Sequence, residues 1–187
     1  DLMMGLVGSE MCIRDRSKYA KMYSTNIDAV HWTNGFWNER YTIIKDTMIQ
    51  SMWHTLHDAD LSHAFKNFEI AAGQCNGTHC GPPFHDGDFY KFFEGVASVY
   101  AQTKDPKLDK MMDEAIEVIG TAQKADGYIY TKKIIEQKRS GKEKMFDDQL
   151  SFEAYNFGHL MTAACVHHRA TGKTSLLSIA KKAADFL

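Results

Sequence analysis

The sequence has no apolar run approaching the roughly 20 residues that a membrane-spanning helix requires, so we expect no membrane span. It also lacks an excess of positive charge, because Lys and Arg number 22 against 24 Asp and Glu and are dispersed along the chain. Without a basic stripe that could follow phosphates, nucleic acid is excluded as a partner. The 44% hydrophobic and 12% aromatic content is typical of a folded globular chain rather than a disordered one.

Cysteine is scarce, and its spacing specifies no particular site. Cys75 and Cys80 lie in a segment that also carries His79 and His85, which is compatible with a zinc site or a short disulfide. The spacing is not the tight C-x-x-C of structural zinc sites, and the second half of such a site is missing. Unpaired loop cysteines are therefore the favoured interpretation, and we assign no metal ligand. Cys165 stands in an apolar helical pattern and is interpreted as a small core residue.

Two other signals of site chemistry are weak. Gly172-Lys173-Thr174 imitates the end of a phosphate-binding loop, but His167 occupies the position where that loop requires glycine. A helix C-cap followed by a solvated lysine is the favoured interpretation. The adjacent His167 and His168 point about 100° apart on a helix and cannot form one chelate.

The chain repeats a helical hairpin. Helix–turn–helix patterns over 84–119 and 151–187 align so that Phe89 pairs with Phe157 and Leu108 with Leu176. Hairpins with one open apolar face occur in stacked or closed arrays, so we expect an all-α fold, an incomplete (α/α)6 toroid of helical hairpins. The inner helices, at about 86–103 and 153–171, should pack side by side in parallel. The second hairpin ends at Leu187 without a stop signal, which predicts a truncated domain.

Local capping and turn signals predict the remaining elements. In chain order these are a helix over 36–56, a shorter helix capped by Ser62 and closed by Gly73, an irregular segment up to Pro83, a helix capped by Asp86, a turn at Asp105-Pro106, an extended piece over 128–131, and a long, partly helical loop over 132–148.

The starts of the two inner helices carry aromatic and polar residues at equivalent positions. Equivalent ends of equivalent helices point to the same side of a toroid. Aromatic rings stack on the C–H faces of sugars while polar groups bond their hydroxyls, so this side is predicted to bind a sugar. The alternative is that Phe84 and Phe152 only plug the hairpin ends. The predicted substrate-binding residues are His85, Asp86, Phe152, Glu153 and Tyr155.

Five segments of the sequence, taken in order, resemble a known family. They are FWNERY, SHAFKNFEIAAG, PFHDGDFYKFFEG, AQKADGYIYT and SFEAYNFGHLMTAACVHHRATGK. Together they resemble the N-terminal half of the catalytic domain of glycoside hydrolase family 127, the β-L-arabinofuranosidase group, over about Ala29 to Leu187. The resemblance implies an (α/α)6 barrel followed by β-sandwich domains and an oligosaccharide substrate whose terminal β-L-arabinofuranoside is hydrolysed with retention.

The resemblance also implies where the chemistry lies. The family's nucleophile is a zinc-bound cysteine, its other zinc ligands are cysteines and a glutamate, and its acid/base is a glutamate. All of them correspond to positions beyond Leu187. We therefore assign no catalytic residue and no cofactor to this chain, expect zinc in the full-length enzyme, and expect the fragment itself to be inactive.

One position departs from the family pattern. Characterised members carry a substrate-binding histidine where Phe152 stands here. A ring in place of a hydrogen-bond donor favours stacking over hydroxyl recognition, so the sugar specificity can differ. Two alternative functions stay open: another (α/α)6 sugar enzyme of the unsaturated glucuronyl hydrolase or epimerase type, and a noncatalytic helical repeat scaffold that binds a protein partner.

Residues 1–16, DLMMGLVGSEMCIRDR, fit nothing that follows and resemble translated sequencing adapter. We interpret them as an artefactual leader, and residues 17–187 as part of one glycoside hydrolase catalytic domain. Since the natural N-terminus is then unknown, a periplasmic and a cytoplasmic location in a bacterium both stay open, and so does the oligomeric state.

Overall fold

The computed structural model describes residues 19, 21, 25–141, 144–148 and 150–187. The interpretation of residues 1–16 as adapter sequence therefore concerns residues outside the described part. Within the described residues the regular structure is entirely helical, and no helix there is long and apolar enough to cross a membrane. The helices are α2 (Gly35–Ile43), the π-helical turn η1 (Ile44–Met48), α3 (Ile49–His57), α4 (Ala64–Ala72), α5 (His85–Thr103), α6 (Pro106–Ala122), α7 (Thr131–Ser140), α8 (Glu153–Thr171) and α9 (Ser175–Phe186).

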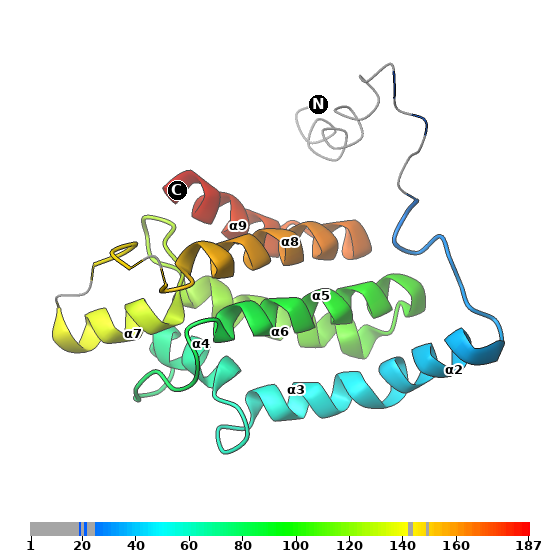
Figure 1. The fold of residues 1–187 in the computed structure, drawn as a ribbon, viewed down its shortest axis with the longest axis horizontal. Helices are drawn as coiled ribbons and strands as arrows, with labels where there is room; N and C mark the ends of the chain where they lie inside the picture. The colour runs from blue at the N-terminus through cyan, green and yellow to red at the C-terminus, as the bar shows by residue number, and fades with distance from the viewer. Residues whose placement is uncertain (1–18, 20, 22–24, 142–143, 149) are drawn as a thin grey trace.

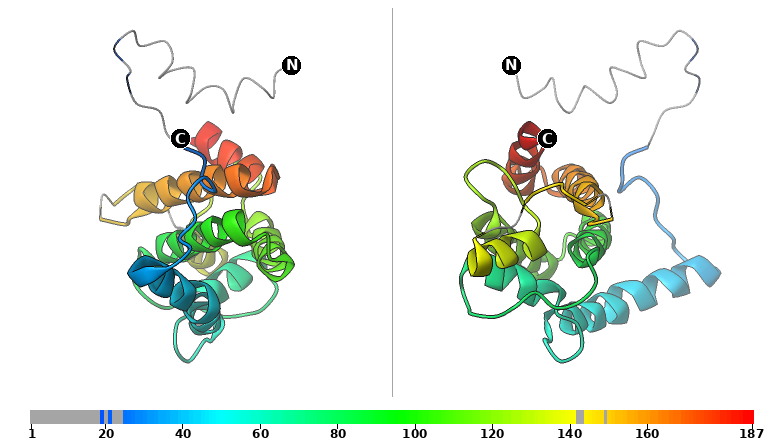
Figure 2. Two further views of the ribbon diagram at one scale, coloured as in Figure 1. Left: turned by 90° about the vertical axis from the view of Figure 1, so that its right-hand side faces the viewer. Right: turned by 60° about the vertical axis from the view of Figure 1, so that its left-hand side comes forward.

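Two hairpins, α5–α6 and α8–α9, form the body of the molecule (Figure 1). Helices α5 and α8 lie side by side and run in the same direction, as both further views also show (Figure 2). Contacts at both ends agree with this direction. Near the helix starts, the Gly87 N–H donates to Asn156 Oδ1 at 2.7 Å, and past the far end of α5 Lys104 Nζ donates to the Ala170 carbonyl at 3.0 Å. The predicted parallel packing of the inner helices is confirmed.

The turns of the two hairpins form as their sequences predict. Asp105 caps α6, because its Oδ1 accepts the Lys107 N–H at 2.9 Å and Pro106 begins the helix. Gly172 closes α8 in the left-handed conformation with φ 77°. Lys173, expected to be solvated, instead reaches α6 and binds two carboxylates at 2.7 Å each, those of Asp109 and Asp113.

The core between the hairpins is built from the repeated apolar positions. Phe89 and Phe157 are buried, and so are Leu108 and Leu176. The prediction that Cys165 belongs to this core is wrong, since its side chain is exposed. Cys165 follows the buried pair 163–164 on α8, and the helical rotation turns its side chain away from the hairpin contact.

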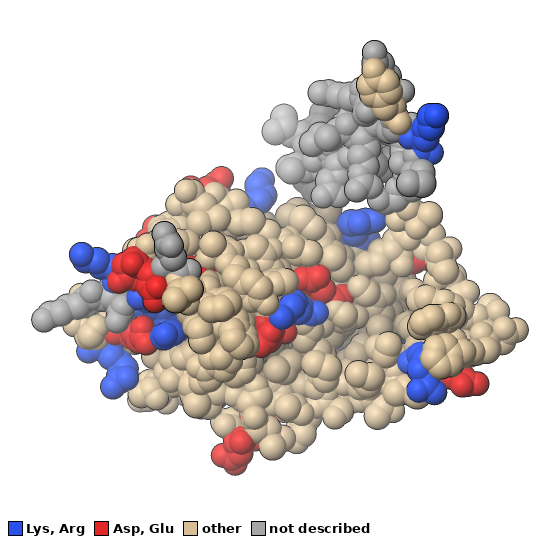
Figure 3. All heavy atoms as spheres, viewed as in Figure 1, with Lys and Arg blue, Asp and Glu red and all other residues tan. Residues whose placement is uncertain are grey.

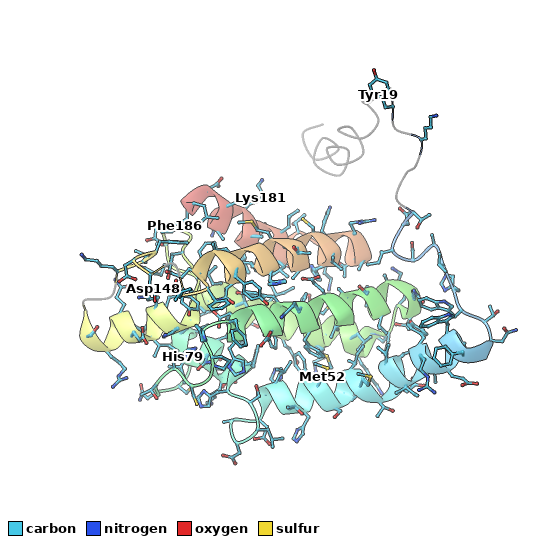
Figure 4. All side chains as sticks on the ribbon, viewed as in Figure 1. Tyr19, Met52, His79, Asp148, Lys181 and Phe186 are labelled. Carbon is cyan, nitrogen blue, oxygen red and sulfur yellow. The ribbon has the colours of Figure 1, made fainter. Side chains whose placement is uncertain are left out.

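The first long helix runs unbroken from α2 through η1 to α3, over 35–57, close to the prediction of 36–56. It lies along one side of α5 (Figure 1). An apolar groove of about 540 Å³ lies between η1 and α3 on one side and α5 on the other. Figure 4 shows Met52 on α3 at this groove, which Phe92 of α5 also lines. Phe36 and Trp37 at the start of α2 are exposed.

One prediction about local structure is confirmed and one needs correction. The stretch 132–148 is partly helical, as predicted, because α7 runs to Ser140, buries Ile134 and Ile135, and closes at Gly141. Asp86 does not cap α5; it lies within the helix, and Phe84 precedes the first turn. Tyr130, directly before α7, has extended backbone angles, φ −153° and ψ 112°, whereas Thr131 of the predicted extended piece 128–131 already begins the helix.

Candidate functional site

A cavity of about 440 Å³ lies at the start of α8. Two aromatic side chains at its wall keep part of their surface exposed, 39% for Phe152 and 38% for Tyr155. Phe152 holds the left-handed conformation, with φ 61°, which turns the chain abruptly into α8. A non-glycine residue in this conformation costs about 1 to 2 kcal/mol, so tertiary contacts must hold it there. The cavity is lined by Phe146, Asp148, Leu150, Ser151, Phe152, Glu153, Ala154 and Tyr155.

Glu153 lies behind the cavity wall, and its carboxylate binds other residues of the protein. The side chain is buried and accepts hydrogen bonds from the Tyr128 hydroxyl, from Ser151 Oγ at 2.8 Å and from the Phe146 N–H at 2.8 Å. Burial and the Glu153 hydrogen bond raise the pKa of Tyr128 far above its ordinary value, so that this phenol keeps its proton. Glu153 therefore fixes the loop before α8.

Asp86, at the start of α5, is likewise a buried carboxylate that accepts hydrogen bonds from within the protein. Its buried carboxylate accepts the Thr131 N–H at 2.8 Å and the Thr131 hydroxyl at 2.6 Å. Burial raises the pKa of Asp86 from 3.8 to about 6, although the two hydrogen bonds oppose this shift. The Tyr130 hydroxyl lies 3.0 and 2.9 Å from the carbonyl oxygens of Pro83 and Ser151, between which it shares its one proton. The segment 128–131, which leads into α7, thus joins the starts of both inner helices.

Asn156 and Gly87 bring α5 and α8 together at the same end. The buried Asn156 side chain accepts the Gly87 N–H through Oδ1 and donates through Nδ2 to the Pro83 carbonyl at 2.9 Å. A β-carbon at Gly87 would stand 2.7 Å from Tyr155 Cε1, so only glycine allows the ring this close to α5. Neither residue was predicted from the sequence, although a polar side chain on the inward stripe of an apolar helix could have identified Asn156.

The Tyr155 ring is held from three sides. Phe152 contacts it edge to face at 5.7 Å between ring centroids, and His159 contacts it at 4.5 Å. The Tyr155 hydroxyl accepts a hydrogen bond from Lys91 Nζ of α5 at 2.9 Å. Phe84 and Phe152 also touch, at 5.5 Å, which fits the alternative that these rings cover the hairpin ends.

His85 lies away from the cavity. Its Nε2 is 3.4 Å from Ser62 Oγ, and its ring packs so closely on Gly81 that a β-carbon there would stand 2.3 Å from Nδ1. Of the predicted substrate-binding residues, the structure thus brings Phe152, Glu153 and Tyr155 together around one cavity. Asp86 is buried against Thr131, and His85 faces the loop that precedes α5.

The cysteine-containing loop forms no recognisable metal centre. Among the described residues no group of three His, Cys, Asp or Glu side chains could hold a metal ion. Cys75 and Cys80 do not form the short disulfide considered as an alternative. His79 is largely enclosed in this loop, and its burial lowers its pKa to about 4, which favours a neutral imidazole.

Comparisons with known proteins converge on one family. The catalytic-domain model of GH127 β-L-arabinofuranosidases matches residues 29–187. The non-reducing end β-L-arabinofuranosidase of Bifidobacterium longum is 33% identical over 172 residues, which cover 83% of this chain and 26% of that enzyme.

Solved structures that resemble this chain belong to the same family. A GH127 β-L-arabinofuranosidase from Geobacillus stearothermophilus T6 superposes with a TM-score of 0.76 at 38% identity, over 84% of this chain and 25% of that one. A second GH127 β-arabinofuranosidase gives 0.74 at 30% identity, over 86% of this chain and 26% of that one. The chain spans about a quarter of the length of these relatives.

Proposed function

Since this chain belongs to glycoside hydrolase family 127, we propose that it supplies part of the sugar-binding wall of an enzyme that hydrolyses a terminal β-L-arabinofuranoside of an oligosaccharide. Its helices form part of the (α/α)6 barrel of that family. The observation that carries the proposal is the pair of partly exposed rings, Phe152 and Tyr155, at the start of an inner helix.

The rings and the buried carboxylates have different parts in this proposal. Phe152 and Tyr155 contact the sugar, since a ring face stacks on the C–H surface of a furanose. Glu153 and Asp86 do not contact the sugar in this proposal but hold the helix starts in place, because their oxygens already accept hydrogen bonds from Tyr128 and Thr131. His85 lies outside the cavity, beside Ser62, so in this proposal only a substrate longer than one sugar reaches it. With Phe152 in the place of a hydrogen-bond donor, recognition rests more on stacking than on hydroxyl bonds.

The bond-breaking groups are proposed to come from other residues of the enzyme. A retaining glycosidase needs a nucleophile and a proton donor on opposite sides of the sugar. Both carboxylates at the starts of α5 and α8 are buried and accept hydrogen bonds on each oxygen, so we assign neither of them to these roles. The zinc expected for the complete enzyme finds no ligand group among the described residues, and we assign none of these side chains to it.

Binding and hydrolysis by the purified chain test the proposal separately. Methyl β-L-arabinofuranoside should shift the NMR signals of Phe152 and Tyr155, while methyl α-L-arabinofuranoside should shift them less. Hydrolysis of p-nitrophenyl β-L-arabinofuranoside should not exceed the uncatalysed rate. Unchanged signals with the β-furanoside would reject the binding wall, and sustained hydrolysis after rigorous purification would reject the assignment of the chemistry to other residues.

A further inference from the structure

A charged network crosses the contact between α5 and α8 beside the cavity. Lys91 Nζ lies 2.7 Å from Asp88 Oδ1, one turn earlier on α5, and donates to the Tyr155 hydroxyl of α8 at 2.9 Å. Asp88 and Lys91 line the groove between α3 and α5, whereas Tyr155 lines the cavity at the start of α8. The network therefore separates the two hollows. In the space-filling view, side chains of both charges stand side by side over this contact (Figure 3).

The network restricts Tyr155 in a defined way. A lysine ammonium can only donate, so the Tyr155 oxygen is the acceptor and its own proton is left for another partner. Phe152 and His159 also pack against this ring, at interplanar angles of 89° and 74°. A ring held at its hydroxyl end and on both sides does not have to be ordered when a ligand stacks on it.

The charges of the network cancel. The hydrogen bond to Asp88, followed by that to Tyr155, raises the pKa of Lys91, which keeps it an ammonium at neutral pH. The Asp88 carboxylate balances this charge at contact distance, and both side chains remain partly exposed. A neutral pair at the edge of a site offers little attraction to an anionic ligand.

We propose that Lys91 is a positioning residue that fixes the Tyr155 ring as a stacking wall, and that Asp88, by neutralising Lys91, makes the site select a neutral sugar over a uronic acid. The inference rests on the proposed function for the identity of the ligand. The fixed ring itself is a property of the free protein and is measured without sugar.

Four variants test this proposal. Lys91→Met removes the donor, Lys91→Arg keeps a donor, and Asp88→Asn keeps the shape but leaves Lys91 unbalanced. Lys110→Met serves as the matched control, because Lys110 is exposed on α6 and pairs with Glu114 of the same helix. The readouts are nuclear Overhauser contacts between the Tyr155 and Phe152 rings in the free protein and the affinities for methyl β-L-arabinofuranoside and methyl β-D-glucuronide.

Lys91→Met should lose the ring contacts and bind the arabinofuranoside about 3- to 10-fold more weakly, the range for one lost hydrogen bond. Lys91→Arg should retain most of the ring contacts and most of the affinity for the arabinofuranoside. Lys110→Met should match the wild type in both measurements. Asp88→Asn should bind the glucuronide about 3-fold more tightly than the wild type does, the scale of one partly exposed charge pair.

The outcomes separate the two proposals. Unchanged ring contacts in Lys91→Met would overturn the positioning role, whatever the wild type binds. Lost ring contacts together with no arabinofuranoside binding by the wild type would refute the proposed function and support the positioning role. An Asp88→Asn protein that gains no affinity for the glucuronide would overturn the role of Asp88 in selectivity.

Discussion

Replacing His167 with leucine should make the protein less sensitive to acid. His167 is completely buried on α8, its ring lies 5.7 Å from that of Phe93, and neither ring nitrogen has a hydrogen-bond partner among the described residues. Burial lowers the pKa of His167 from 6.5 to about 4, and the nearby Lys173 adds to this effect. Leucine has a similar volume and no polar atom, so it should fill the same space.

The size of the effect follows from the two pKa values. Because the pKa of His167 is lower in the folded state, the folded protein binds fewer protons, and its stability falls as the pH drops from about 6.5 to about 4. Between about pH 7.5 and pH 5 this one group costs about 2 kcal/mol of unfolding free energy. His167→Leu should remove that loss. At neutral pH it should also stabilise the fold by about 1 kcal/mol, since no unpaired polar ring stays buried.

Urea unfolding followed by circular dichroism at the two pH values measures this difference. His54→Leu is the control: its side chain is exposed on α3, and His167 stays in place, so acid sensitivity should match that of the wild type. Direct NMR titration of the His167 ring gives an independent reading of its pKa. An equal loss of unfolding free energy at pH 5 in His167→Leu and the wild type would contradict this role of His167. A His167 ring that titrates near pH 6.5 would contradict it as well.

Four further substitutions test the site. Asp86→Asn should make the protein more sensitive to acid, in contrast to His167→Leu. The pKa of Asp86 is higher in the folded state, about 6 against 3.8, so its contribution to stability is present at low pH and is lost as the pH rises from about 4 to 6. In the same urea assay the variant should lose about 1 kcal/mol more unfolding free energy than the wild type between pH 7.5 and pH 5. Gly87→Ala should lower the melting temperature, because a β-carbon 2.7 Å from the Tyr155 ring and 2.9 Å from Asn156 Oδ1 costs about 1 to 3 kcal/mol, whereas Gly95→Ala, with nothing within 4 Å, should raise it by helix propensity. Tyr128→Phe should cost about 2 kcal/mol in urea unfolding, since buried Glu153 loses a donor; a loss below about 0.5 kcal/mol would contradict this role. Phe152→Ala should weaken binding of methyl β-L-arabinofuranoside by about 1 to 2 kcal/mol in an NMR titration, and an unchanged affinity would leave Phe152 with a packing role only.

The hairpins could be predicted from the sequence because their signals are local. The spacing of Phe89 and Leu108, repeated at Phe157 and Leu176, encodes the buried stripe of each helix, and Asp105-Pro106 encodes a turn. A repeat of this kind also implies the parallel packing of α5 and α8, since equivalent helices in stacked hairpins point the same way.

The details of the site could not be predicted, because they depend on partners distant in the chain. Asp86 has the local signature of a helix cap, but its actual partner, Thr131, lies 45 residues further on. Lys91 resembles any solvated lysine on a helix until α8 brings Tyr155 to it. His85 precedes Asp86 directly, yet the first turn of α5 sends its side chain toward Ser62 instead of the cavity.

The segment 128–131, which leads into α7, limits how freely either hairpin can be exchanged with that of a relative. Its Tyr128 side chain serves the α8 hairpin through Glu153, while Thr131 serves the α5 hairpin through Asp86. A chimera that took one hairpin from a relative but kept this segment would require both carboxylates, or a matching replacement for each. The two hairpins thus share one geometry but depend on one connecting segment. A chimera should fold only when its residues 128–131 match the carboxylates at the starts of both α5 and α8.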